Sequence, residues 1–372
     1  MEDAGLYGDS IQGTCRFMCP EKEIDLRERE ELLHFLEGVK DETGRFRCVR
    51  SRVVKEYSRP AAGKEDPEPS DLRPAHVLKK TVDYLLGRVA VRTDRSWSVL
   101  YDFVFDRLRA VRQDMVIQSI GGCDGIELLE KIVRFHIYAG YRLCTQPMSV
   151  YDPQINDQHT QECLKRLITL YGVVPPDHAH QEEFESLYLM FNLGQTDALM
   201  HFYDLPKHVR ELPLVGQAYR ISLAHNLGNA VRSLRLMEPE KYKRYPLFVC
   251  AAHRHISNIQ SKTLHVLSVG FNSKSFAYPL DKLTRLLWYT DTSQASDSCM
   301  HHGLTITEQS SILFQKTSFR YPDKVLHTHH PEIDEILSPV CLADIFLQGG
   351  ATPEALEQDG ITKKFGTKNW GD

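Results

Sequence analysis

Residues 97–118 constrain the fold of this chain most strongly. Their apolar side chains recur at spacings of three and four, which places them on one stripe of a helix. The stripe consists of Trp97, Leu100, Tyr101, Val104, Phe105, Leu108, Val111 and Met115. The segment contains neither Pro nor Gly, is too long for a strand and is too charged to span a membrane. A helix of this kind must bury its stripe against other helices.

Further helical patterns follow along the chain, and residues 126–143 predict the first partner helix. Up to residue 236 the pattern predicts about nine helices joined by short turns, which is typical of a two-layer stack of helical hairpins. No exact repeat of about 34 residues is visible, so a regular tetratricopeptide array is not indicated.

The pattern changes after Pro246. A helix up to about residue 267 is followed by a breaker cluster and by a short amphipathic helix that contains Leu280, Leu283, Leu286, Leu287 and Trp288. After a polar loop, two runs at residues 304–307 and 312–319 are rich in Ile, Thr and Phe and predict a β-hairpin. Helices followed by a terminal hairpin indicate a winged helix, so we expect residues 246–325 to form a winged-helix module.

The remaining segments are expected to be less regular. Residues 1–12 predict a disordered tail, and residues 59–74, rich in proline and acidic side chains, predict a loop inside a helical region that spans residues 13–245. Residues 326–372 predict a tail that contains a short helix and ends in a loose polar stretch.

Composition excludes several classes of protein. With 42% hydrophobic and 26% charged residues, no long apolar run and an acidic N-terminus, the chain resembles an ordinary soluble protein of the cytosol or nucleus, without a membrane span. The net charge of −5 argues against non-specific nucleic-acid binding by the whole chain. However, residues 241–324 carry eleven Lys and Arg against five Asp and Glu, a net of +6, which leaves −11 for the rest.

Motifs of catalysis are missing from the sequence. It contains no GxxxxGK[ST] loop, HExxH, GxSxG or paired CxxC, and its nine cysteines are scattered. We therefore predict no enzyme, no catalytic or metal-binding residue, no cofactor and no small-molecule substrate. The histidines at positions 253, 255, 301, 302, 327, 329 and 330 could be metal ligands, but exposed polar side chains are the favoured interpretation.

The basic residues allow two kinds of surface. On residues 97–118, Arg107, Arg109 and Arg112 could bind phosphate, but their alternation with Asp106 and Asp114 favours structural ion pairs. In the predicted winged helix, one interpretation is a nucleic-acid surface made of Lys274, Lys282, Arg285, Lys316 and Arg320. The other is partner docking by Leu283, Leu286, Leu287 and Trp288, with the cations as a solvated rim.

Five long strings occur in one order along the chain. They are GTCRFMCPEKE, VKEYSRPAAG, SDLRPAHVLKKTVDYLL, FVFDRLRAVRQDMVIQ and EKIVRFHIYAGYRL. Together they resemble the Sac/GANP family of the PCI superfamily, from about residue 13 to about residue 321. The resemblance implies a mostly α fold, in which a right-handed, TPR-like helical-repeat stack is followed by a C-terminal winged helix.

The resemblance also implies a role as a scaffold subunit. The implied partners are a second PCI-domain protein and a small acidic Sem/DSS-type subunit, with RNA or DNA as a further candidate. A small family member acts in centrosome duplication, spindle assembly and mitotic progression, which implies the cytoplasm, centrosome and spindle. The alternative is an RNA-binding adaptor in nuclear messenger-RNA export, as in the TREX-two complex. The chain lacks the Phe-Gly-rich region and the centrin-binding helix of the large members, so tethering to the nuclear pore is not expected.

Overall fold

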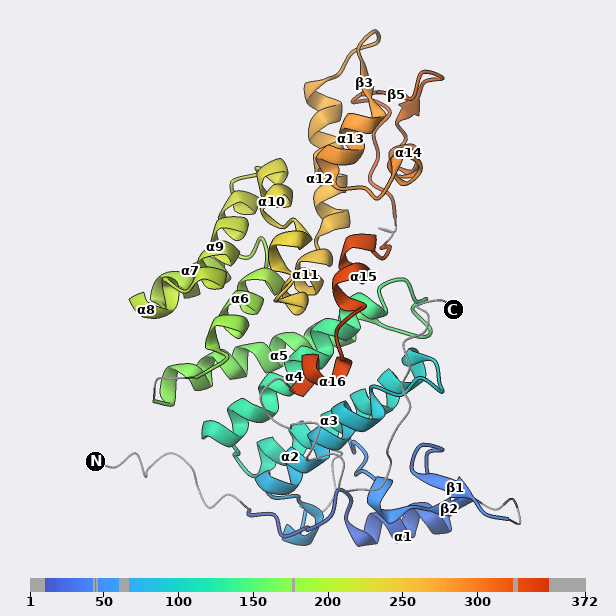
Figure 1. The fold of residues 1–372 in the computed structure, drawn as a ribbon, viewed down its shortest axis with the longest axis vertical. Coiled ribbons are helices and arrows are strands. Elements are labelled where there is room, and N and C mark those ends of the chain that lie inside the picture. The colour runs from blue at the N-terminus through green and yellow to red at the C-terminus, as the bar shows by residue number, and fades with distance from the viewer. Residues whose placement is uncertain are drawn as a thin grey trace. The chain divides into compact units, whose positions relative to one another are not determined.

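The chain is mostly helical in its computed structural model, in agreement with the helical patterns of the sequence (Figure 1). The structure describes residues 11–42, 44, 46–59, 67–175, 178–323 and 327–347. These residues belong to two compact units. Unit 1 comprises residues 1–135, 160–176 and 341–372, and unit 2 comprises residues 136–159 and 177–340.

Unit 1 combines helices with one short hairpin. Its elements are α1 (Glu21–Arg29), β1 (Gly38–Lys40), β2 (Phe46–Cys48), the 3-10 turns η1 (Arg50–Arg52) and η2 (Pro69–Asp71), α2 (Ala75–Tyr84), the π-helical turn η3 (Leu85–Val89), α3 (Trp97–Ile117) and α16 (Leu342–Leu347). It also holds the first part of α4 (Gly122–Arg142) and the last part of α5 (Pro153–Val173).

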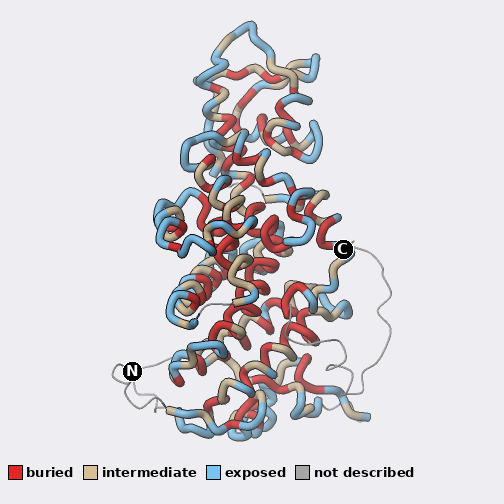
Figure 2. The backbone as a smooth tube through the Cα atoms, turned by 60° about the vertical axis from the view of Figure 1, so that its left-hand side comes forward, coloured by how far each residue is buried: buried red, intermediate tan, exposed pale blue. Residues whose placement is uncertain are grey.

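Helix α3 confirms the strongest prediction from the sequence. Six of the eight residues of its predicted stripe are buried, while Trp97 and Phe105 are half-buried. The last turns of unit 1 pack nearby, since α16 lies against η3 and the Phe346 ring meets Phe135 edge-on at 5.8 Å. Figure 2 shows the buried residues along the inner sides of these helices.

Unit 2 contains the remaining helices and a small sheet. Its elements are α6 (Gln181–Phe191), α7 (Thr196–Asp204), α8 (Lys207–Arg210), α9 (Pro213–Asn226), α10 (Ala230–Leu236), the 3-10 turn η4 (Pro239–Tyr242), α11 (Pro246–His253), α12 (Ile256–Gly270), β3 (Ala277–Pro279), α13 (Leu280–Leu287), α14 (Thr292–His301), β4 (Thr305–Ile306), β5 (Ser311–Leu313) and α15 (Pro331–Leu337), together with the adjoining parts of α4 and α5.

The helices of unit 2 form successive layers. Helix α6 packs on α9, which packs on α10, while α11 packs on both α6 and α15. Pro213 and Pro246 start α9 and α11, where a missing backbone N–H costs nothing. These pairs agree with the predicted stack of helical hairpins.

Residues 256–320 form a module at the end of the stack, called here the C-terminal module. Its sheet is antiparallel in the order β3-β5-β4, with Tyr278 and Ile306 both opposite Ile312. The predicted hairpin between β4 and β5 is therefore confirmed, although β5 is shorter than the run at residues 312–319. Strand β3 falls in the predicted breaker cluster, because pairing with β5 stabilises three residues whose own pattern is not strand-like.

The prediction of a polar loop after residue 288 is wrong. Residues 292–301 form α14, whose N-terminus is capped by the Asp291 carboxylate accepting from the Gln294 backbone N–H at 2.8 Å. The helix buries only Ala295 and Cys299, so its sequence carries almost no apolar periodicity. Its docking on α13 supplies the stability that its composition does not.

The terminal segments lie partly outside the described residues. Positions 1–10 of the predicted N-terminal tail and positions 348–372 of the C-terminal tail lie outside them. So do positions 60–66 of the predicted internal loop. The described part of the C-terminal tail contains α15 and α16, so the helical patch predicted there is present as two short helices. Within the described ranges, no helix combines the length and the apolar character needed to cross a bilayer.

Candidate functional site

Helix α13 carries most of the residues that the sequence offered for binding. Its Leu280, Leu283 and Leu287 are buried and face the core of the C-terminal module. Leu283 and Leu287, two of the predicted docking residues, are each 0% exposed, so the module itself covers their side chains. They follow the stripe spacing of an amphipathic helix, which brings them to the inner face.

Leu286 and Trp288 remain partly exposed beside this core. Trp288 ends α13 in the left-handed region at φ 59°, a conformation that is rare for a bulky residue. Its ring lies 4.5 Å from that of His330. Burial raises the pKa of the Glu332 carboxyl group, which lines the same groove as Trp288. Because of its contact with His330, Trp288 is held in place rather than free to rotate.

All five predicted nucleic-acid residues are exposed, but they have different neighbours. Arg285 pairs with Asp281 at 2.8 Å, and this exposed pair contributes little to stability. The backbone N–H of Lys316 donates to Asn272, next to Lys274, whereas that of Arg320 donates to the carbonyl of His302. Lys282 lies on α13 with Arg285. The cations are thus distributed over several parts of the C-terminal module rather than gathered in one patch.

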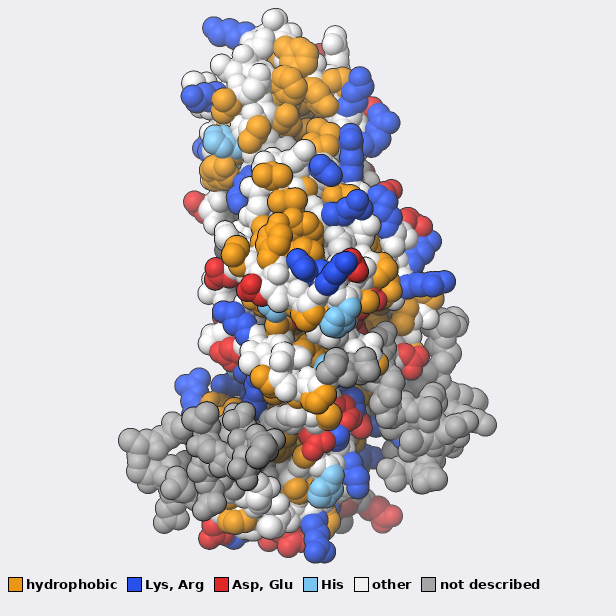
Figure 3. All heavy atoms as spheres, turned by 90° about the vertical axis from the view of Figure 1, so that its left-hand side faces the viewer, with side chains coloured by type: hydrophobic (Ala, Val, Ile, Leu, Met, Phe, Trp, Pro, Cys, Tyr) orange, Lys and Arg blue, Asp and Glu red, His pale blue; other side chains and the backbone are white. Residues whose placement is uncertain are grey.

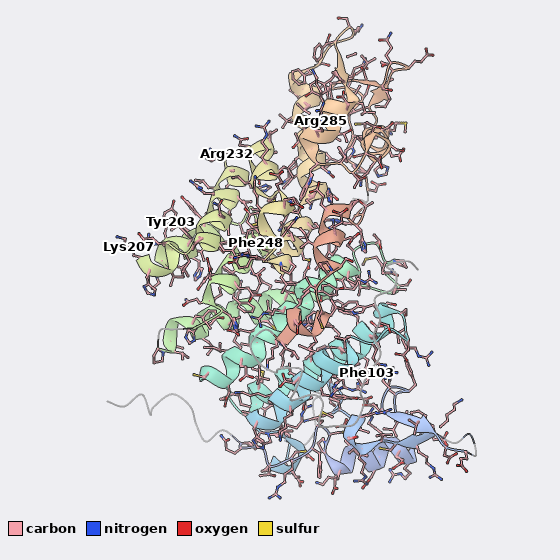
Figure 4. All side chains as sticks on the ribbon, viewed as in Figure 1. Phe103, Tyr203, Lys207, Arg232, Phe248 and Arg285 are labelled. Atoms are coloured by element: carbon pink, nitrogen blue, oxygen red, sulfur yellow. The ribbon has the colours of Figure 1, made fainter. Side chains whose placement is uncertain are left out.

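A groove between α10 and α13 was not predicted from the sequence. It measures about 530 Å³, and its lining includes Leu234, Arg235, Lys282, Arg285, Leu286, Trp288, Glu238 and Glu332. We call it the α10–α13 groove. Arg232 lies on α10 and Arg285 on α13, the two helices that border it (Figure 4). The sequence could not reveal it, because about 50 residues separate its two walls.

An exposed apolar cluster lies at the α12–β3 connection. Phe271 and Phe276 are 39% and 45% exposed, with ring centroids 5.4 Å apart, and Val266 and Val269 on α12 are 66% and 46% exposed. We call these four residues the apolar tip. Figure 3 shows hydrophobic side chains gathered on this end of the C-terminal module. Large apolar side chains in contact with water mark interaction surfaces when they are contiguous.

The histidines differ from their predicted exposure. His253, His302 and His330 are buried, and His253 shares a hydrogen bond of 2.8 Å with the Thr328 carbonyl. Burial lowers the pKa of His253 to about 3, and that of His255, which contacts the Met190 carbonyl, to about 3. Among the described residues, no group of His, Cys, Asp and Glu has the arrangement of a metal site.

Arg107 and Arg112 of α3 form structural ion pairs, as favoured from the sequence, whereas Arg109 lies over the Tyr57 ring at 3.8 Å. Arg107 donates to Glu56 at 2.7 Å and to Glu37 at 3.3 Å, and Asp114 accepts from Arg73 and Lys55, each at 2.7 Å. Arg107 also pairs with Asp106 on the same helix, at 2.6 Å. These groups are mostly buried in unit 1, so they are not available as a phosphate-binding surface.

Comparison with known proteins identifies the family. The model of the SAC3/GANP family matches residues 18–308, which is most of the chain. The chain belongs to the SAC3/GANP family. The resemblance inferred from the five strings is therefore confirmed.

Three relatives illustrate the extent of this similarity within the SAC3/GANP family. Protein xmas of Drosophila melanogaster is 30% identical over 82% of this chain and 15% of its own length. SAC3 family protein 1 of Schizosaccharomyces pombe is 30% identical over 82% of this chain and 32% of its own length. SAC3 family protein B of Arabidopsis thaliana is 27% identical over 70% of this chain and 16% of its own length. The chain thus spans a third or less of the length of these SAC3/GANP relatives.

Proposed function

We propose that this SAC3/GANP-family chain is a non-enzymatic scaffold subunit of a PCI-type complex. The carrying observation is the element order α12-β3-α13-α14-β4-β5, with its three-stranded antiparallel sheet, because this order is that of a winged helix. A stack of helices that ends in such a module supports the PCI-type prediction. The absence of catalytic motifs from the sequence supports a role in assembly rather than chemistry.

The apolar tip is the proposed docking surface for a second PCI-domain subunit. Aromatic side chains are enriched at interfaces because they bury a large area at a small entropic cost. Phe271 stacks on Tyr278 at 5.7 Å, so the tip is supported from below by the sheet. The tip takes the place of Leu283 and Leu287 as the docking surface, since those two side chains are already covered.

Mutation of the tip tests this proposal. The double variant Phe271→Ala/Phe276→Ala should weaken binding to the second subunit at least tenfold, because hot-spot aromatics carry most of an interface's energy. Titration calorimetry with co-purified PCI-domain subunits measures the affinity. The matched control is Met200→Ala/Tyr203→Ala on α7, where the side chains are 55% and 53% exposed (Figure 4). Equal affinities of the tip variant and the control would refute docking through the tip.

The cellular process is proposed from the family resemblance alone. A centrosomal and mitotic role is the first proposal, with messenger-RNA export as the alternative, and the small acidic Sem/DSS-type subunit is expected to bind the partner's helices. Fractionation separates the two processes: co-sedimentation with centrosomes supports the first, and RNase-sensitive nuclear material supports the second.

Nucleic-acid binding is a second candidate activity, favoured by the exposed cations of the C-terminal module. Lys316 and Arg320 have no carboxylate partner among the described residues. The variant Lys316→Ala/Arg320→Ala should weaken RNA binding. The slope of the log affinity against the log salt concentration should become shallower by about 1 for each phosphate that is no longer bound. A gel shift of the assembled complex over a salt series measures both. An unchanged affinity and slope would exclude these residues from nucleic-acid contact.

A further inference from the structure

We propose that the α10–α13 groove binds a peptide segment of a partner protein, in which carboxylates flank a large apolar anchor. This site is separate from the apolar tip and does not require the second PCI-domain subunit. The proposal rests on the charge of the groove walls, on the partly exposed apolar side chains of Leu286 and Trp288, and on the conformation of Trp288.

The walls carry more cations than the local acids neutralise. Arg235 on one wall and Lys282 on the other are exposed, and neither has a carboxylate partner within the described ranges. Of the two acids, Glu238 is already paired with Lys241 at 2.8 Å, and burial raises the pKa of Glu332, which disfavours its charged form. Carboxylates from a partner can therefore pair with both walls at once.

Two side chains of the groove lining supply an apolar surface. These are Leu286 and Trp288, and both are partly exposed. Trp288 adopts φ 59°, where Gly is the usual residue at the end of a helix, and strained conformations of this kind are found at functional sites. Because the indole packs on the His330 ring, this apolar surface is pre-organised, which reduces the entropy lost when a side chain packs on it.

The mixture of charges favours a peptide over a nucleic acid. Glu238 and Glu332 line the groove among the cations, so its surface does not offer the continuous row of positive charges that a row of phosphates would need. A peptide can place a carboxylate opposite each cation and an apolar side chain between them. An apolar centre with a charged rim is also the usual composition of a protein interface.

Fluorescence anisotropy with a defined peptide tests the proposal. The probe is a fluorescein-labelled Asp-Glu-Leu-Phe-Asp-Glu peptide, added to the full chain. We expect saturable binding that weakens about tenfold in Arg235→Glu/Lys282→Glu and in Leu286→Ser. The matched control, Lys274→Glu/Lys316→Glu, changes the net charge equally but lies outside the groove, so it should bind as the wild type does. Circular dichroism checks that each variant folds.

Three results would overturn the proposal. They are no saturation of the wild type at millimolar peptide, equal losses in the groove and control variants, and displacement of the peptide by a ten-nucleotide oligouridine that itself binds through Arg235 and Lys282. The variant Phe271→Ala/Phe276→Ala distinguishes this site from the apolar tip. It should retain peptide affinity while losing the second subunit, so either proposal can fail without the other.

Discussion

Glu37 is the residue of unit 1 whose replacement we expect to lower the stability of the fold most. It is 0% exposed, and its carboxylate accepts from Arg27, Arg107 and the backbone N–H groups of His34 and Val54. The variant Glu37→Gln keeps the shape but leaves two buried guanidinium groups short of a negative charge. We expect the free energy of unfolding to fall by about 3 kcal/mol, which urea denaturation measures.

The surface residue Glu28 provides the control for Glu37. It lies exposed on α1, and Glu28→Gln should change stability by less than about 0.5 kcal/mol. Similar urea midpoints for both variants would mean that Glu56, which also accepts from Arg27 and Arg107, is sufficient to compensate the two arginines.

The positions of single site residues show what periodicity can predict. Leu280, Leu283 and Leu287 share a helical stripe, a signal that marks them as core, whereas Leu286 falls off the stripe and stays partly exposed. The same signal argues against docking by Leu283 and Leu287, because the stripe of an amphipathic helix normally faces the core. The burial of His253 has no such signal, because its hydrogen-bond partner Thr328 lies 75 residues away.

Among the elements, those with strong apolar periodicity were predicted and those stabilised by tertiary contacts were not. Helix α3 follows its predicted bounds within a residue, and the β4–β5 hairpin was anticipated from its Ile- and Thr-rich runs. Helix α14 and strand β3 were missed because each gains its stability from a neighbour. The β1–β2 hairpin was also missed, because the residues of its strands show no clear alternation of apolar and polar side chains.

At the scale of the whole molecule, the mostly helical character and the family followed from the sequence, while the surfaces did not. The α10–α13 groove joins segments about 50 residues apart along the chain, and sequence spacing does not encode such contacts. A second property of the whole chain emerges only from the structure, because burial lowers the pKa of many histidines. They are His34, His225, His253, His255, His302, His327 and His330.

These histidines make the folded chain sensitive to acid. His253 and His255 have a pKa of about 3 when folded, against an ordinary value of 6.5 when unfolded. Stability is therefore complete above pH 6.5 and falls as pH drops towards 3, because only the unfolded chain binds the protons. Between pH 7 and pH 5 the free energy of unfolding should fall by about 2 kcal/mol for each of these two histidines. Urea midpoints of His253→Gln/His255→Gln should accordingly change less with pH than those of the wild type, whereas the exposed control His208→Gln should follow the wild type. Parallel pH profiles for all three proteins would show that neither histidine is buried in its neutral form.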